Sequence, residues 1–145
     1  MNGIFIYYSL TGSGDVVAER MKEKGYEVRK VISARRLPKK FFFRVLSGGF
    51  LAGLGAKDKL KDFDENIADF DEIVIGSPVW NGRFSTPINA VLDKLDLNNK
   101  KLRFVLYSGS GEAPKALKKI SACYPQAVTT VLKEPKDHPD ELVKI

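Results

Sequence analysis

A loop rich in hydroxyl groups and glycine follows the first apolar segment of the chain. Ser9, Thr11 and Ser13 stand close to Gly12 and Gly14. These small residues leave backbone N–H groups open to a ligand, and the hydroxyls add further donors. The loop leads into a predicted helix, whose first turn offers unpaired N–H donors and a partial positive charge. The loop therefore predicts a phosphate site, although a capped strand–helix turn without a ligand explains the same residues. It has neither the GKS/T ending nor the GxGxxG spacing of common nucleotide loops.

Two later loops also carry residues suited to binding a ligand. The loop from Ser77 to Ser85 holds Trp80, the single tryptophan of the chain, which offers a flat apolar face. Asn81 and Gly82 follow it and permit positive φ angles. The loop from Ser108 to Glu112 is rich in glycine, which allows a ligand to approach the backbone closely. Together the loops suit a phosphorylated flat ring better than any one of them does.

Apolar segments and helical periodicities alternate along the chain and place these loops. Continuous or alternating apolar patterns predict five strands, and an apolar spacing of three and four residues predicts the helices between them. Such alternation indicates right-handed βαβ units and a parallel sheet, in which ligands bind beyond the carboxyl ends of the strands. The expected strands are 4–8, 26–32, 72–76, 102–107 and 127–132, and helices are expected after Ser13, Thr86, Ala113 and Asp137. The second strand alternates with charged residues, as a strand at a sheet edge does. On the helix after Ala113, we expect Ala116, Leu117 and Ile120 on the buried face.

The connection between the second and third strands, at about residues 33–70, is the least regular part of the chain. It contains a basic cluster, 35–44, followed by Phe43, Leu46, Phe50 and Leu54 near a helical period. This pattern predicts a glycine-weakened helix that covers one sheet face. An amphipathic segment that contacts a partner or a membrane surface is the alternative. No linker divides the chain, so we expect one domain over residues 1–145.

Composition narrows the classes of function. The 145 residues are 43% hydrophobic and 29% charged, with a net charge of +6. This excess favours anionic partners or reflects a lysine-rich surface, and no zinc-ligand spacing or basic–aromatic interleaving points to specific nucleic-acid binding. Cys123 is the single cysteine, which fits a reducing cytoplasm. We expect no signal peptide, no membrane span, no metal site and no catalytic side chain; His138 and Cys123 are expected to be a capping residue and a core residue.

Three motifs, in order, resemble the FMN-binding loops of the flavodoxin-like family: Tyr7–Ser13, Gly76–Gly82 and Tyr107–Gly111. The resemblance implies a three-layer, doubly wound α/β fold with a five-stranded parallel sheet in the order 2-1-3-4-5. It also implies FMN as cofactor. The first loop would hold the phosphate, Trp80 would stack near the isoalloxazine, Asn81 and Gly82 would lie near flavin N5, and the third loop would approach the pyrimidine side. The cofactor-binding residues so implied are Ser9, Leu10, Thr11, Gly12, Ser13, Gly14, Ser77, Pro78, Val79, Trp80, Asn81, Gly82, Ser108, Gly109, Ser110 and Gly111.

The chain also departs from the family pattern, which leaves two functions open. Gly14 replaces a hydroxyl residue of the family loop, Asp15 adds a carboxylate beside it, and the chain is basic where electron-carrier flavodoxins are acidic. The first hypothesis is electron transfer with FMN, as a carrier or a small oxidoreductase, with a redox partner protein that could be acidic. A quinone or NADPH-linked reductase is a weaker variant of it. The alternative is a fold with weakened FMN binding that serves as a basic interaction module. The short last helix predicts cover by residues 37–55 or a homodimer.

Overall fold

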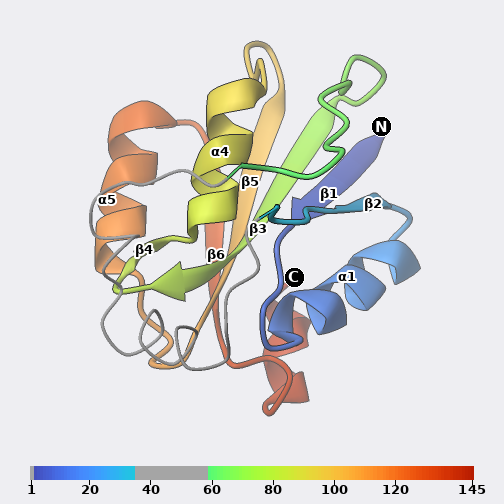
Figure 1. Ribbon diagram of the computed structural model, residues 1–145. Coiled ribbons are helices and arrows are strands. Elements are labelled where there is room, and N and C mark those ends of the chain that lie inside the picture. Colours follow the sequence, from blue (N-terminus) through green and yellow to red (C-terminus); the bar gives the residue numbers. More distant parts are fainter. Residues whose placement is uncertain (1, 35–58) are drawn as a thin grey trace.

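A computed structural model describes residues 2–34 and 59–145, and these form a parallel sheet with helices on both faces (Figure 1). The predicted helix over residues 43–54 and the basic cluster lie outside the described residues. The strands are β1 (Gly3–Tyr7), β2 (Glu27–Lys30), β3 (Glu72–Trp80), β4 (Arg83–Phe84), β5 (Lys101–Ser108) and β6 (Val128–Lys133). The helices are α1 (Ser13–Glu23), α4 (Thr86–Lys94), α5 (Pro114–Cys123) and a short 3₁₀ helix, η1 (Pro139–Lys144).

The sheet has the topology that the sequence predicts. The strand order is β2-β1-β3-β5-β6, and all four of these pairings are parallel. Counting only the five predicted strands, this is the order 2-1-3-4-5. β2 lies at an edge, as its charged alternation indicates. The doubly wound α/β architecture is therefore confirmed. The carboxyl ends of β1, β3, β5 and β6 lie together at one end of the strands, which is called the carboxyl edge of the sheet below.

Strand alternation divides the core into two layers. On β1, Ile4 and Ile6 face the layer covered by α4 and α5, whereas Phe5 and Tyr7 face the layer covered by α1. β5 alternates in the same way, because successive side chains of a strand point to opposite faces. In Figure 1, α4 and α5 lie on one side of the sheet, and α1 with the C-terminal helix lies on the other. The last residue, Ile145, is buried against the α1 layer and extends the cover that the short tail helix provides.

The loop predicted to begin at Ser77 is a strand in the structure. β3 continues to Trp80, turns through Asn81 and Gly82, and pairs antiparallel with β4. Both turn residues have positive φ, 52° and 74°, as a two-residue hairpin turn requires. Pro78 is tolerated in β3 because β1 pairs only as far as Gly76. The missing N–H of Pro78, two residues further on, faces the side where β1 has ended.

Three smaller expectations also need correction. Leu117, predicted on the buried face of α5, is 38% exposed, because that helix is covered only along Ala116 and Ile120. The residue that precedes α4 is Ser85 rather than Thr86. Cys123 is exposed rather than part of the core.

Candidate functional site

The loop between β1 and α1 is held together by the hydroxyl of Ser9. Its Oγ accepts the N–H of Gly12 at 3.2 Å and the N–H of Gly14 at 3.1 Å. Gly12 has φ 102°, a conformation that glycine adopts without strain. The carbonyl of Gly12 accepts the Val16 N–H and so begins the helical hydrogen bonds. The loop is therefore a rigid entry to α1.

Several donors of this loop remain open. The N–H groups and hydroxyls of Thr11 and Ser13 have no hydrogen-bond partner within residues 2–34 and 59–145. Ser13 is only 9% exposed, yet its side chain lines a cavity rather than contacting a protein acceptor. Because these groups border a cavity and have no protein acceptor, they are available to an external acceptor. Their place at the first turn of α1 favours an anion.

Gly14 is required by the packing beneath the loop. A Cβ at this position would lie 2.6 Å from the Tyr107 hydroxyl oxygen, 2.8 Å from Ser9 Cβ and 2.9 Å from the Tyr8 carbonyl oxygen. The Tyr107 hydroxyl donates to that same carbonyl and so joins the end of β5 to the loop. Burial raises the pKa of Tyr107 well above its ordinary value, so the hydroxyl remains a donor. The residue that departs from the family pattern thus has a packing reason of its own.

The negative charge of Asp15, next to the first loop, is compensated by Lys30. Its Oδ1 accepts the Tyr7 hydroxyl at 2.9 Å and the Lys30 ammonium at 2.7 Å. Partial burial acts to raise the pKa of this carboxyl, but the bonds from Lys30 and Tyr7 outweigh burial and the pKa is lowered. The carboxylate therefore stays ionised and paired with Lys30, which limits the repulsion it exerts on a bound anion.

The hairpin places its residues differently from the predicted loop. Trp80 is 1% exposed and packs edge-on against Tyr8, with ring centroids 6.0 Å apart, so it is not the exposed aromatic platform that the sequence predicts. Strand alternation turns it into the core. Ser77 is fully buried, and its Oγ bonds with the Ser85 hydroxyl and backbone N–H at 3.0 Å, which fixes the hairpin to the start of α4. Val79, Asn81 and Gly82 instead face a cavity.

The third loop is stiffened by its own serines. The hydroxyl of Ser108 bonds to the Glu112 carbonyl at 2.8 Å and lies 3.1 Å from the Ser110 hydroxyl, which accepts the Glu112 N–H. Gly111 takes φ 79° and lies against Lys133. The backbone from Ser108 to Ser110 is thereby held in one shape beside the hairpin.

Two adjoining cavities bring the three segments together at the carboxyl edge of the sheet. One, of about 270 Å³, lies between the first loop, β3 and the end of β5; the other, of about 450 Å³, lies between the hairpin, the third loop and the start of α5. Val79, Ser108 and Gly109 line both. Among the predicted binding residues, those that line a cavity are Thr11, Ser13, Pro78, Val79, Asn81, Gly82, Ser108, Gly109 and Ser110. The predicted residues outside these linings are Ser9, Leu10, Gly12, Gly14, Ser77, Trp80 and Gly111.

Comparison with known proteins identifies the family of this arrangement. The model of the NADPH-dependent FMN reductase family matches residues 12–133. The chain belongs to this family. The resemblance to flavodoxin-like proteins is confirmed, and membership of the FMN reductase family supports FMN as the cofactor. No curated protein sequence matches the chain.

Solved structures share the fold. A protein classed as a flavoprotein from Bacteroides eggerthii DSM 20697 superposes with a TM-score of 0.77 at 18% identity, over 99% of this chain and 97% of that chain. A flavoprotein from Lactobacillus acidophilus NCFM in complex with FMN gives a TM-score of 0.67 at 20% identity, over 96% and 97%. At these identities the likeness concerns the fold alone.

A fourth segment, which the sequence interpretation missed, also reaches this edge. Glu134 lines the 270 Å³ cavity, and the Lys136 ammonium donates to the Thr11 carbonyl at 3.0 Å. Both residues follow β6 and lie outside the span matched by the FMN reductase family. Their position could have been inferred, because β6 is parallel to its neighbours and must end at the same edge of the sheet.

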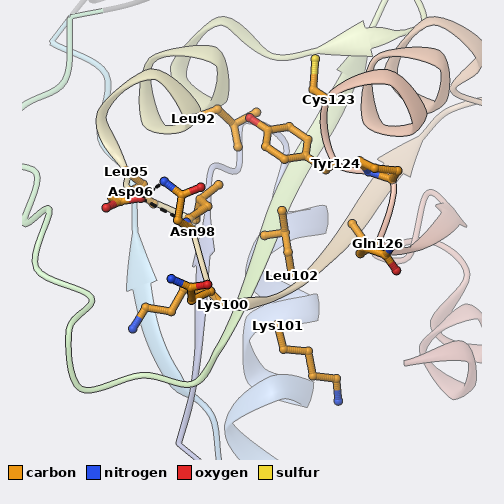
Figure 2. A pocket seen from close by; sticks show the side chains of 14 residues that line it. Leu92, Leu95, Asp96, Asn98, Lys100, Lys101, Leu102, Cys123, Tyr124 and Gln126 are labelled. Carbon is orange, nitrogen blue, oxygen red and sulfur yellow. Dashed lines mark hydrogen bonds between the residues drawn. The ribbon is translucent and has the colours of Figure 1, made fainter.

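A larger cavity, of about 570 Å³, lies at the opposite edge of the sheet (Figure 2). Its walls come from the ends of α4 and α5 and from the start of β5, with Leu92, Leu102 and Tyr124 among the side chains drawn. In parallel α/β sheets, ligands bind at the carboxyl edge, so size alone does not make this cavity the functional site. Within the described residues, no group of three or more metal-ligating side chains occurs. The described helices include none that is long and apolar enough to span a membrane.

Proposed function

We propose that the chain binds FMN at the carboxyl edge of its sheet and acts in electron transfer as a small FMN-dependent oxidoreductase. The observation that carries this proposal is the pair of adjoining cavities lined by the first loop, the hairpin and the third loop, with the open donors of Thr11 and Ser13 on the narrower one. Family membership supports the same cofactor and favours a reductase over a simple carrier. A phosphorylated flat ring matches a narrow donor-lined cavity next to a wider one.

The residues fit FMN in distinct roles. The donors of Thr11 and Ser13 suit the phosphate, and Ser9 acts by holding the loop in shape. Asn81 and Gly82 suit the ring edge, where a two-residue turn can change its peptide orientation at low cost. Trp80 supports the hairpin from below instead of stacking on the ring.

The chemistry divides between cofactor and chain. Bound FMN supplies hydride acceptance from a nicotinamide and onward transfer of electrons. The chain binds and orients the ring, excludes water from its buried edge and presents backbone hydrogen bonds that set the potential. We also propose an acidic redox partner protein, which the net charge of +6 supports, and a cytoplasmic location, which the single cysteine supports. A homodimer is proposed because the last helix, η1, is short.

Titration of the apo-protein with FMN, with riboflavin as control, tests the binding step. We expect micromolar or tighter binding of FMN, quenching of flavin fluorescence and weaker binding of riboflavin. Failure of a folded protein to bind either flavin refutes the proposal and favours the basic interaction module.

A matched pair of variants tests the location. Ser13→Ala removes a donor that lines the narrow cavity, and we expect about three- to tenfold weaker FMN binding. Ser121→Ala, on the exposed surface of α5, is the control and should bind as the wild type does. Anaerobic mixing of the FMN-loaded protein with NADPH then separates a reductase, which bleaches the flavin absorbance, from a carrier, which does so only through a partner enzyme.

A further inference from the structure

The turn that follows β6 is fixed to its surroundings at several points. The Glu134 N–H donates to the Ser108 carbonyl at 3.0 Å, and the Glu134 carbonyl accepts the N–H groups of Asp137 and His138 at 2.9 Å. Pro135 is buried. At the other side of the turn, the Glu141 carboxylate accepts the Lys133 N–H at 2.9 Å and pairs with Lys144. Lys136 is therefore presented from a rigid support.

This turn aims Lys136 at the first loop. Its Nζ lies 3.0 Å from the Thr11 carbonyl oxygen, and a Cβ placed on Gly12 would meet Lys136 Cδ at 3.3 Å and Nζ at 3.6 Å. The ammonium has three protons, and the Thr11 carbonyl uses one of them. The remaining two lie at the rim of the loop whose N–H and hydroxyl donors are open.

The charge of Lys136 has no counter-ion in the part of the chain that the structure describes. Asp15, the acidic residue of the loop, is paired with Lys30 at 2.7 Å. Glu134 lines the 270 Å³ cavity on the side of the third loop, where its Oε1 lies 3.3 Å from a Cβ placed on Gly109, and it forms no ion pair with Lys136. A positive charge is thus held beside the first turn of a helix, with neither nearby carboxylate bonded to it.

We propose that Lys136 is a ligand of the cofactor phosphate and the residue by which this chain prefers phosphorylated flavin over riboflavin. The inference rests on the proposed function, since it assumes that FMN occupies the site. An ammonium contributes a charge-assisted bond that neutral loop donors do not supply. Lys136 lies three residues beyond the span that the family model matches, 12–133.

The experiment compares FMN and riboflavin binding to the wild type, Lys136→Met, Lys136→Arg and Lys118→Met. Lys118 is exposed on α5, so its replacement by Met is the control that makes the same change in net charge. For Lys136→Met we expect about ten- to hundredfold weaker FMN binding and unchanged riboflavin binding. Lys136→Arg should retain most of the affinity for FMN. Raising the salt concentration should weaken FMN binding by the wild type more than by Lys136→Met.

The outcomes separate this inference from the proposed function. Wild-type protein that binds no FMN refutes both together. FMN binding that is unchanged in Lys136→Met, or reduced equally in Lys118→Met, overturns the inference and leaves the proposed function standing. Equal losses for FMN and riboflavin in Lys136→Met also overturn it, because a phosphate ligand cannot affect a flavin that lacks phosphate.

Discussion

Replacing Gly14 by alanine tests the packing that joins the first loop to β5. The added methyl group would lie 2.6 Å from the Tyr107 hydroxyl oxygen and within 3 Å of two further atoms, Ser9 Cβ and the Tyr8 carbonyl oxygen. Overpacking of this kind costs about 1–3 kcal/mol. The higher helix propensity of alanine returns at most about 1 kcal/mol at this position in the first turn of α1. We therefore expect a net loss of about 1–2 kcal/mol in the free energy of unfolding.

A double-mutant cycle identifies the atom responsible. Tyr107→Phe removes the hydroxyl oxygen and its bond to the Tyr8 carbonyl, which costs about 1 kcal/mol alone. In Gly14→Ala/Tyr107→Phe the closest contact is gone, whereas the contacts at 2.8 Å and 2.9 Å remain. The loss of unfolding free energy in the double variant should consequently be smaller than the sum of the two single losses by about 0.5–1 kcal/mol.

Urea unfolding followed by circular dichroism measures these free energies. Gly25→Ala is the matched control, because Gly25 has φ 87° with no atom within 4 Å of an added Cβ. The loss of unfolding free energy in Gly25→Ala comes from backbone strain alone, and it should add to the loss caused by Tyr107→Phe. Additive losses for Gly14→Ala and Tyr107→Phe, or a Gly14→Ala protein as stable as the wild type, would refute the packing argument.

Three further variants or measurements probe the same edge of the sheet. Ser9→Ala removes the acceptor of two loop N–H groups, and we expect a loss of about 1–2 kcal/mol in urea unfolding together with weaker FMN binding. Asp15→Asn should destabilise by less than about 1 kcal/mol at pH 7. Since the pKa of Asp15 is lowered in the folded state, this contribution is present above its ordinary pKa of 3.8 and is lost as the pH falls through the folded value, so the stabilities of the two proteins should converge as the pH is lowered below 3.8. Trp80, 1% exposed, should show blue-shifted emission and slow quenching by acrylamide; rapid quenching would contradict its burial.

The sheet could be predicted because each of its strands has a clear pattern. Ile4, Phe5 and Ile6 are all buried although they point alternately to the two faces of the sheet, and a central strand with helices on both sides gives that burial. In β2, charged residues alternate with apolar ones because it is the outermost strand of the sheet and is partly open to solvent. The three ligand loops follow from the same argument, since parallel strands end together.

The hairpin could not be placed in this way. The sequence prediction places Pro78 in a loop from Ser77 to Ser85, and proline is rare inside a sheet because it removes a ladder hydrogen bond. Pro78 nevertheless lies in a strand, because β1 pairs only as far as Gly76 and no β1 carbonyl lacks a hydrogen bond from Pro78. Placing Trp80 in a loop also led to the prediction of an accessible ring, whereas the alternation of side chains along β3 buries it. The pair Asn81-Gly82, between Val79-Trp80 and Arg83-Phe84, is the hairpin signal that the sequence offers.

Parallel topology predicts that the residues after β6 reach the ligand edge of the sheet, but it does not predict the contact of Lys136 with the first loop. The contact of Lys136 with Thr11 joins residues 125 positions apart, and a lysine in a polar tail looks like any solvated charge until the turn is seen. Gly14 is a similar case, because the residue that leaves no room for a side chain there is Tyr107, which lies on another strand.

The exposed thiol of Cys123 has a practical consequence for the study of assembly. It lines the cavity at the edge of the sheet opposite the ligand loops, and the chain has no second cysteine to pair with it. Under air, two molecules can join through this one sulfur and run as a covalent pair without any native interface. Measurements of oligomeric state therefore require reductant or a Cys123→Ser protein. The same isolated thiol accepts a spectroscopic label far from the cofactor loops, so movements on flavin binding can be followed without touching the site.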